Sequence, residues 1–576
     1  MQLGSLAEVG PKAASWPVLL FGLCLAALAF RVTLGVDLGD EAYYAAFIDG
    51  WLKDGLGKSP FLMVHQTADL VVYPLALLYR AMRGNADGLV LFLRLLYLTV
   101  SALSAACLYR AIAPYRGRAL ALLAALFSLL FIPFSLPAPS YNTIGMMSLV
   151  GALSLFAAGI SQASPQRLEP AWAGLPRSLW FSGLWWAVAC VAYPPMLAPL
   201  MAALALSLVA LRNDAQRSLV RRYAVGCGAL LAIAFLMLCA ALGPAKLMQM
   251  LRFTNAFNNV SGGVGGKLQT AIHAFAAHRR FALICIAALL VGGARCLRSP
   301  KARLLSDVAL GLLVVGVWTS EMPTFFSRAH DLVLVLALTG ICVAFRQMVL
   351  PDADGRTRMF AVVCGASFIG GLATAAAAFN GLFNFPIGGF LAACLALVLP
   401  APGSLLQRAV RLCVMALACA AMAATTFTTY YGQIDPLSYK TSVRVSHGAF
   451  AGLRTDPDQA TFMARMTDAI ERQRACGSRF AVIGTGPGFY LLTTMSPTAL
   501  STWNFPGEAR NFATEAVESF YREPANQPDV LVVNNWQWAT PLSTSDRALL
   551  EKYTLAERVR VGIRDASVYR RTGCAG

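Results

Sequence analysis

Residues 16–45 read WPVLLFGLCLAALAFRVTLGVDLGDEAYYA, an apolar run followed by an acidic turn. The run, residues 16–36, is about as long as a helix needs to be to cross a bilayer. Lys12 precedes it and no clear small-residue cleavage site is present, so we expect an uncleaved anchor rather than a removed signal peptide. The stretch therefore predicts a membrane helix that delivers Asp40 and Glu41 to a membrane surface.

Similar apolar runs recur along the 576-residue chain. Hydrophobic residues make up 57% and charged residues only 13%, against about 25% charged in soluble domains, so a purely soluble protein is excluded. With the first run we expect about thirteen transmembrane helices. The other twelve runs lie at about 87–110, 119–137, 142–160, 178–193, 194–211, 223–243, 281–297, 303–320, 328–348, 358–379, 384–400 and 408–428.

Basic residues in alternate loops predict the orientation of these helices. Cytoplasmic loops of membrane proteins carry an excess of Lys and Arg. One set of alternate loops holds Arg110, Arg116, Arg118, Arg167, Arg177, Arg212, Arg217, Arg221, Arg222, Arg295, Arg298, Lys301, Arg303, Arg346, Arg356, Arg358, Arg408 and Arg411. We expect this side to be cytoplasmic, together with the N-terminus. The net charge of +18 is then explained by basic residues in loops next to the membrane, which set the topology. Membrane lipids are expected partners, and no nucleic-acid partner is expected.

Three segments on the opposite, outer side are longer than simple connections. The first outer loop, 37–86, contains two amphipathic stretches, 41–52 and 66–82, which are expected to lie in the membrane interface. The basic outer segment, 244–280, carries cations although it faces outward. The third is the C-terminal region. We therefore divide the chain into a transmembrane domain, 1–429, and an extracytoplasmic domain, 430–576.

The C-terminal region has the pattern of a soluble α/β domain. A polar helix is expected at 458–474 and strands at 479–483, 529–533 and 566–570, which together suggest a partly parallel sheet. The glycine-rich stretch Gly484–Gly488 follows the first strand. Pro487 breaks the dinucleotide-binding pattern and no acidic partner follows, which favours a strand-to-helix turn.

Cys476 and Cys574 are the only cysteines of this region, and the other twelve lie in or beside the apolar runs. If the strands that follow Cys476 and precede Cys574 pair antiparallel, with Arg479 opposite Arg571, the two thiols face each other. An extracytoplasmic location would allow a disulfide. Two unpaired thiols are the alternative.

The adjacent carboxylates Asp40 and Glu41 allow two interpretations. They are either part of a solvated acidic loop or a catalytic pair that faces a lipid-linked substrate. A carboxylate can accept the proton of an acceptor hydroxyl as a sugar carbon is attacked.

An Asp-Glu pair in the first outer loop, followed by Ala42, Tyr43 and Tyr44, resembles the GT-C membrane glycosyltransferases. The nearest likenesses are protein O-mannosyltransferases and lipid A aminoarabinose transferases, although Tyr43 stands where the latter usually have Arg. The general arrangement of helices and loops is similar over the whole chain, but the shared sequence motif comprises only about five residues. The resemblance implies a GT-C fold and an inverting glycosyltransferase, with Asp40 as general base and Glu41 orienting or binding the acceptor.

The resemblance further implies a sugar donor on a polyprenyl phosphate, whose phosphate needs cations. Cations of the basic outer segment and the outer end of the run at 328–348 are the candidates. They are Arg252, Lys267, Arg279, Arg280, Arg328 and His330. Interface snorkelling to lipid head groups is the alternative for each arginine.

Five residues are candidates for the acceptor cavity: Asp37, Tyr44, His65, Asp69 and Tyr141. Arg94 lies inside an apolar run, where it is either functional or paired with an acid of the first outer loop. No cofactor and no metal are expected, because the lipid-linked donor is itself a substrate.

The function so predicted is transfer of a monosaccharide to a cell-envelope glycan, lipid or protein, on the outer face of a bacterial inner membrane. Arabinose, glucose, mannose and aminoarabinose donors all carry the same polyprenyl-phosphate group, so the sequence does not identify the sugar. A transporter or flippase of a lipid-linked sugar is one alternative, and an oligosaccharide ligase is another.

Overall fold

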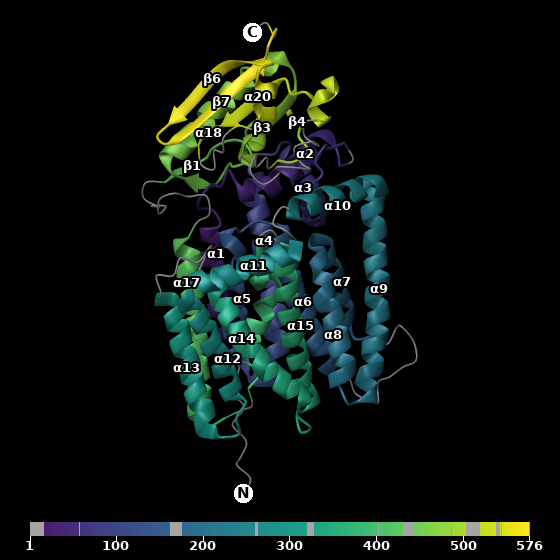
Figure 1. The fold of residues 1–576 in the computed structure, drawn as a ribbon, viewed down its shortest axis with the longest axis vertical. Helices are drawn as coiled ribbons and strands as arrows, with labels where there is room; N and C mark the ends of the chain where they lie inside the picture. The colour runs from purple at the N-terminus through teal and green to yellow at the C-terminus, as the bar shows by residue number, and fades with distance from the viewer. Residues whose placement is uncertain are drawn as a thin grey trace.

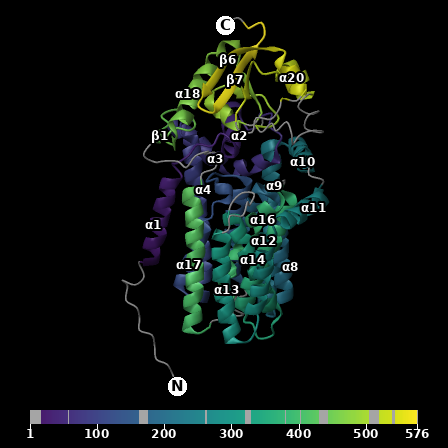
Figure 2. The same ribbon diagram turned by 60° about the vertical axis from the view of Figure 1, so that its left-hand side comes forward.

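The computed structural model describes residues 16–56, 58–161, 175–259, 263–319, 328–378, 380–400, 403–429, 442–484, 486–502, 519–536, 542 and 544–574. A helical bundle carries the C-terminal α/β region at one end (Figures 1 and 2). Lys12, Arg167 and the predicted domain boundary at residue 430 lie outside the described residues. The division into two domains therefore stays a prediction.

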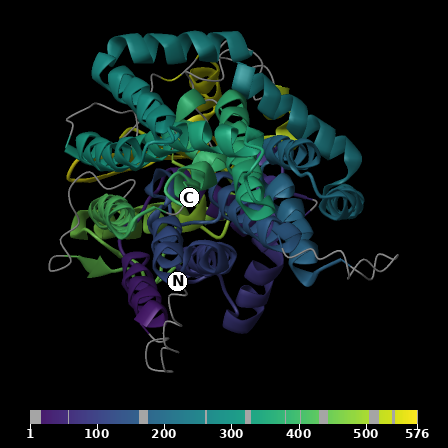
Figure 3. The ribbon, with the colours of Figure 1, turned by 90° about the horizontal axis from the view of Figure 1, so that it is seen from below.

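Each of the thirteen predicted runs contains a helix. The helices are α1 (Trp16–Arg31), α4 (Leu89–Arg116), α5 (Arg118–Leu130), α6 (Tyr141–Ser161), α7 (Arg177–Ala192), α8 (Leu197–Ala210), α9 (Asp214–Leu242), α12 (Arg279–Arg295), α13 (Pro300–Thr319), α14 (Arg328–Val349), α15 (Gly355–Ala377), α16 (Phe385–Leu395) and α17 (Leu405–Thr428). Helix α1 lies at the edge of the bundle, as the view from below shows (Figure 3).

Length and composition qualify fewer of these helices as membrane spans. Within the described residues, seven are long and apolar enough to cross a membrane: α4, α6, α9, α13, α14, α15 and α17. An eighth is added if the bent pair Gly265–Ala277 and Arg279–Arg295 forms one span. The chain is thus a multi-pass membrane protein, but thirteen crossings are not confirmed.

Helix α5 shows why some predicted runs are longer than their helices. The run was expected to continue to residue 137, but α5 ends at Leu130 and Pro133 opens the short 3-10 turn η3 (Pro133–Ser135). Phe134 and Ser135 have φ values of 54° and 58°, a left-handed conformation that is unfavourable for residues with a Cβ. Arg31 Nη2 donates to the Ser135 carbonyl at 3.3 Å, which helps to hold this turn inside the protein.

Helices α6 and α16 fill the centre of the bundle, and α15 packs closely against α16. A Cβ on Gly388 would lie 2.1 Å from the backbone carbon of Gly370, so only glycine permits this approach of the two helices. At the predicted cytoplasmic end, Asp307 on α13 accepts from Arg295 on α12 at 2.6 Å and from Arg411 on α17 at 2.9 Å. This buried triad ties three helices together.

Four helices belong to the outer segments. They are α2 (Asp40–Asp54), α3 (Thr67–Arg83), α10 (Pro244–Asn259) and α11 (Gly263–Ala277). The predicted stretches 41–52 and 66–82 are therefore helical. Residues 41–52 are buried throughout, so α2 presents no open face to a membrane surface, whereas Leu77 and Leu78 on α3 are exposed. Short 3-10 turns precede three helices: η2 (Val64–Gln66) precedes α3, η6 (Pro194–Met196) precedes α8 and η7 (Gly381–Asn384) precedes α16.

The C-terminal region holds a mixed sheet of five strands in the order β4-β3-β5-β7-β6. Strand β3 is parallel to β4 and β5, and β7 is antiparallel to β5 and β6, which confirms a partly parallel sheet. The elements are β1 (Val443–Arg444), β2 (Arg454–Thr455), α18 (Pro457–Glu471), η8 (Arg474–Cys476), β3 (Arg479–Ile483), η9 (Pro487–Leu492), β4 (Ser496–Pro497), η10 (Pro524–Asn526), β5 (Val530–Asn534), α20 (Thr544–Leu550), β6 (Tyr553–Val561) and β7 (Arg564–Arg571).

Cys476 and Cys574 form a disulfide with their Cα atoms 5.5 Å apart. The bond confirms the expected pairing, but the strand register proposed for it is wrong. Strand β5 lies between β3 and β7, and Asp529, just before β5, bonds Arg479 at 2.9 Å and Arg571 at 3.7 Å. The start of β3 and the end of β7 share one edge of the sheet, and this brings the cysteines together across β5.

The C-terminal region packs directly on the first outer loop, and the two share one apolar cluster. Gly35 N donates to the Arg454 carbonyl at 2.8 Å, and Arg454 N donates to the Thr33 carbonyl at 2.8 Å. Val90 N, at the start of α4, donates to the Ala449 carbonyl at 3.0 Å. The region therefore caps the end of the bundle where α2 begins.

Candidate active site

The acidic turn at the start of α2 is ordered by Asp37. Its Oδ1 accepts from Gly39 N at 2.7 Å and its Oδ2 accepts from Glu41 N at 2.8 Å, so Asp37 satisfies backbone donors at the helix N-terminus. Burial, followed by the charge of Asp40, raises the pKa of Asp37 to about 7. Asp40 is the first residue of α2 and is only partly buried. The helix dipole favours a negative charge there.

Glu41 has a different environment from Asp40. It is 1% exposed, and its two carboxylate oxygens accept from Nε and Nη2 of Arg94 on α4, each at 2.5 Å. Arg94 also donates to the carbonyls of Val32, Leu34 and Gly35, at 2.8–3.0 Å. The expected pairing of Arg94 with an acid of the first outer loop is confirmed. The ion pair gives Glu41 a structural task, while its predicted contact with an acceptor stays a prediction.

An aromatic cluster lies beside the acidic turn. The His65 ring stacks on Tyr141 at a centroid distance of 4.3 Å, and Tyr43 Oη lies 3.4 Å from His65 Nδ1. Tyr44 lies 5.0 Å from Tyr43 and 6.1 Å from Tyr141 between ring centroids. Burial lowers the pKa of His65 to about 4, so the imidazole is neutral near pH 7. The structure thus brings together three predicted cavity residues, Tyr44, His65 and Tyr141.

Asp69, in the first turn of α3, faces the same cluster. Burial, then the charges of Tyr141, Asp69 and Asp40, raise the pKa of Tyr43 well above its usual value, which places both carboxyls near this ring. Asp69 is 0% exposed, and neither of its carboxyl oxygens has a hydrogen-bond partner among the described residues. Burial raises the pKa of Asp69 well above its usual value, which favours the protonated acid.

Three residues of this site were missed by sequence reasoning. Tyr43 was noted only as a departure from the family motif. Tyr193 lies in the short connection between α7 and α8, 4.9 Å from Tyr141 between ring centroids. Asn384 Nδ2 donates to Asn142 Oδ1 at 3.2 Å beneath the cluster. It follows the uncharged outer stretch 380–383, which gave no chemical signal.

The C-terminal region contacts the acidic turn and helix α2 through η9. Gly488 N, in η9, donates to the Leu38 carbonyl at 2.9 Å, and a Cβ at 488 would lie 2.8 Å from Leu38 Cα. Lys53 Nζ, near the end of α2, donates to the carbonyls of Tyr490 at 3.1 Å and Thr493 at 2.6 Å. Apart from Thr485, which is outside the described residues, the stretch Gly484–Gly488 is therefore a turn that docks on the acidic loop.

The predicted phosphate-binding residues are spread over four helices. Arg252 on α10 and Arg279 and Arg280 at the start of α12 are exposed. Lys267 on α11 donates to the Ala376 carbonyl at 2.9 Å. The exposed Arg328 begins α14, and its Cζ lies 5.6 Å from the Trp318 ring centroid.

His330 has a different environment from these cations. It is buried, and its ring lies 5.3 Å from Phe131 and 4.7 Å from Phe134 between centroids. Helix α10 itself docks on the first outer loop, where Thr254 Oγ1 accepts from Val64 N at 2.8 Å. The basic segment thus adjoins the site, and a phosphate-binding role for the six residues stays a prediction.

Comparison with solved structures assigns the fold. The *Archaeoglobus fulgidus* oligosaccharyltransferase, tethered with an acceptor peptide, matches 94% of this chain and 72% of its own, with 12% identity and a TM-score of 0.50. Its apo form matches 90% and 70%, with 13% identity and the same TM-score. The chain has the fold of a GT-C membrane glycosyltransferase.

ArnT from *Cupriavidus metallidurans*, bound to undecaprenyl phosphate, covers more of both chains but superposes less well. The match covers 98% of this chain and 99% of ArnT, with 16% identity and a TM-score of 0.42. Sequence comparison finds no matching family and no matching curated protein. At these identities the GT-C likeness is one of fold and does not establish the activity.

Proposed function

We propose that the chain is an inverting glycosyltransferase that moves a monosaccharide from a polyprenyl-phosphate donor to a cell-envelope acceptor. The observation that carries the proposal is the position of Asp40. It begins α2 as a partly exposed carboxylate, beside an aromatic cluster and on a GT-C fold. We place the reaction on the outer face of a bacterial inner membrane, as the loop charges predict.

In this mechanism Asp40 acts as the general base. Its carboxylate accepts the proton of an acceptor hydroxyl while the hydroxyl oxygen forms a bond to the anomeric carbon. The bond from that carbon to the phosphate oxygen breaks, and polyprenyl phosphate leaves with the electron pair. A single displacement of this kind inverts the anomeric centre.

The neighbouring acids are less suited to the role of base. Glu41 is enclosed by its ion pair with Arg94, and Asp37 uses both oxygens to order the turn. Asp69 is buried near Tyr43 and Tyr44 with a raised pKa, so it favours donating a hydrogen bond over accepting a proton. Asp40 is therefore the acid whose position fits proton transfer best.

The aromatic cluster supports sugar binding. Tyr44, Tyr141 and His65 offer apolar ring faces and polar edges within one cluster. We propose that an acceptor or donor sugar packs against these rings, with Asp69 and Asp37 behind them. The acceptor is a glycan, a lipid or a protein of the envelope.

The donor phosphate is assigned to the cations that adjoin the loop. Preorganised positive groups stabilise the charge that develops on a leaving phosphate. Arg252, Lys267, Arg279, Arg280 and Arg328 come from segments at the predicted outer end of the bundle, and His330 lies two residues after Arg328. Their role in the proposal is to receive the phosphate of the donor after cleavage.

The test uses purified protein with labelled polyprenyl-phosphate sugars. We expect release of polyprenyl phosphate together with transfer of the labelled sugar to an envelope extract. Movement of intact donor across vesicles without cleavage would instead identify a flippase. Consumption of only longer lipid-linked oligosaccharides would identify a ligase.

A further inference from the structure

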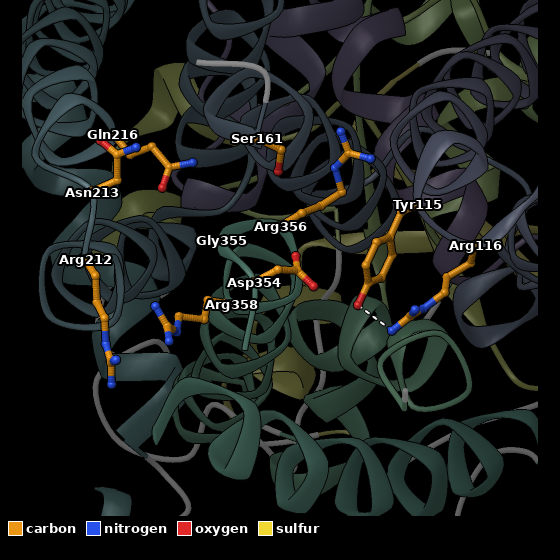
Figure 4. Close-up of a pocket in the computed structure, with 10 residues that line it drawn as sticks. All are labelled: Tyr115, Arg116, Ser161, Arg212, Asn213, Gln216, Asp354, Gly355, Arg356 and Arg358. Carbon is orange, nitrogen blue, oxygen red and sulfur yellow. Dashed lines mark hydrogen bonds between the residues drawn. The ribbon is translucent and has the colours of Figure 1, made fainter. Parts of the chain in front are cut away.

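A cavity of about 650 Å³ lies at the end of the bundle away from the acidic loop. The end of α4, the end of α6, and the starts of α9 and α15 meet around it (Figure 4). Helix α4 joins the two ends of the protein: Arg94 holds Glu41 near its start, and Arg116 lines the cavity at its end. The helix rises by about 33 Å over the 22 residue steps from Arg94 to Arg116, so the cavity is separate from the proposed active site.

Four arginines line this cavity: Arg116, Arg212, Arg356 and Arg358. A single carboxylate, that of Asp354, lies among them, with Arg212 and Arg358 on one side of it and Arg116 on the other in Figure 4. Asp354 accepts from Thr357 N at 2.8 Å and from Thr357 Oγ1 at 2.7 Å, so it caps α15. The lining therefore has a surplus of positive charge.

The arginines are held by backbone carbonyls, which orient a guanidinium but neutralise none of its charge. Arg212 and Arg358 both donate to the Pro351 carbonyl, at 3.1 Å and 2.6 Å, which brings two like charges together. Arg116 donates to the Val398 and Leu399 carbonyls at 2.8 Å and 3.0 Å. These contacts fix the cations in advance of any ligand.

Arg358 shows most clearly that the positive charge is only partly compensated. Its residue is 5% exposed, and its Nε has no hydrogen-bond partner among the described residues. Asp354 and Asp352 offset part of its charge, while Arg212 adds repulsion. A buried cation that is not fully compensated is unfavourable. The N-termini of α9 and α15 add the positive ends of two helix dipoles to the same cavity, although Asn213 accepts from Ala215 N and Asp354 from Thr357 N.

We infer that this arginine pocket binds the phosphate of an anionic molecule, either an anionic phospholipid headgroup or a soluble phosphate ester. Guanidinium groups bind phosphate through paired, charge-assisted hydrogen bonds, and Arg212 and Arg358 present two such groups side by side. The loop charges predict that this end of the bundle faces the cytoplasm, where anionic lipids attract basic pockets between helices. The bound phosphate would hold the ends of four helices together.

The experiment measures binding to the full-length purified protein in neutral detergent. Phosphatidylglycerol is titrated against phosphatidylcholine by native mass spectrometry, and glycerol 3-phosphate is tested as a competitor. The variant is Arg212→Gln with Arg358→Gln. The control is Arg221→Gln, an exposed arginine on α9 that does not line the cavity.

We expect phosphatidylglycerol to be retained in preference to phosphatidylcholine. The double variant should bind phosphatidylglycerol at least about tenfold more weakly, because it loses two guanidinium groups that can form charge-assisted hydrogen bonds to phosphate. Competition by glycerol 3-phosphate would identify a soluble ester as ligand, and lack of competition would identify the lipid. Arg212→Gln alone, at an exposed side chain, keeps the test valid if the double variant does not fold. Equal retention of both lipids with no binding of glycerol 3-phosphate, or binding that neither variant changes, would overturn the inference.

Discussion

The first outer loop and the basic outer segment are predicted to share one face of the membrane, but they are built differently. In the first outer loop, residues 41–52 are buried, and most of its acids have fixed partners: Arg94 for Glu41, Lys53 for Asp49 and two backbone N–H groups for Asp37. In the basic outer segment, Arg252, Arg279 and Arg280 are exposed. One region fixes its charged groups, whereas the other presents them to the surroundings.

This difference fits two roles: proton transfer in the first outer loop and attraction of the donor phosphate by the basic outer segment. Proton transfer depends on placing a base to within a fraction of an ångström, which requires a rigid support. Attraction of a phosphate tolerates looser placement, since charge acts over several ångströms. Changes that loosen the first outer loop are therefore expected to have large effects, and single changes in the basic outer segment small ones.

Removing Arg94 should produce the largest effect. Arg94→Ala leaves Glu41 buried without a counter-charge, and breaking a buried ion pair in this way costs about 3–5 kcal/mol. We expect a clearly lower melting temperature of the purified protein and loss of activity. The double variant Arg94→Met with Glu41→Leu should recover much of the stability, because no buried charge remains. A single variant as stable as the wild type would contradict the anchoring role of this pair.

Removing the disulfide should have the second-largest effect, because the C-terminal region packs on the first outer loop. Its cysteines are 98 residues apart, and opening a loop of this length removes about 2–5 kcal/mol of stability. Cys476→Ser with Cys574→Ser should raise hydrogen exchange in strands β3, β5 and β7. Cys413→Ser, at an exposed free cysteine on α17, is the matched control. Unchanged exchange in the double variant would show that the bond does not support this region.

Gly488→Ala should lower activity more than stability. The new Cβ would lie 2.6 Å from Leu38 Cδ2 and 2.8 Å from Leu38 Cα, so the turn that carries Asp40 has to move. Displacement of a reacting group by about 1 Å can lower turnover by roughly 10²-fold. The control is Gly228→Ala on α9, where a Cβ has open space. Turnover equal to the control would show that η9 does not position the acidic turn.

The basic outer segment and Arg328 at the start of α14 should give the smallest single effects. Exposed ion pairs contribute about 0–1 kcal/mol, so Arg252→Ala, Arg279→Ala, Arg280→Ala or Arg328→Ala should each weaken donor use only several-fold. The change should appear in the KM for the donor and not in that for the acceptor, and it should shrink at high salt. If a variant combining all four leaves the donor KM unchanged, the phosphate site lies elsewhere.

Apolar length and turn chemistry made much of the fold predictable. All thirteen runs contain helices, and strand β3 begins and ends where expected, at Arg479 and Ile483. The span count was less predictable, because η3 removes residues 131–137 from α5 although they are apolar. The order of strands was missed as well, since sequence does not reveal that β5 lies between β3 and β7.

The candidate site was predictable where residues lie close in sequence to the acidic motif. Asp37, Asp40, Tyr44, His65 and Asp69 all belong to the first outer loop. Tyr193 and Asn384 come from distant connections and carry no charge, so no local pattern marks them. The role of Gly488 depends on contact between two separate regions, and only the structure shows that contact.

The variant Asp40→Asn tests most directly whether Asp40 is the base of the proposed glycosyl transfer. Asn keeps the shape of the side chain and cannot accept the proton, so sugar transfer from a polyprenyl-phosphate donor should fall by about 10²–10⁴-fold. Asp54→Asn, at the other end of α2, should retain near wild-type turnover, and both variants should keep the wild-type melting temperature. Near-normal transfer by a folded Asp40→Asn protein would exclude Asp40 as the base.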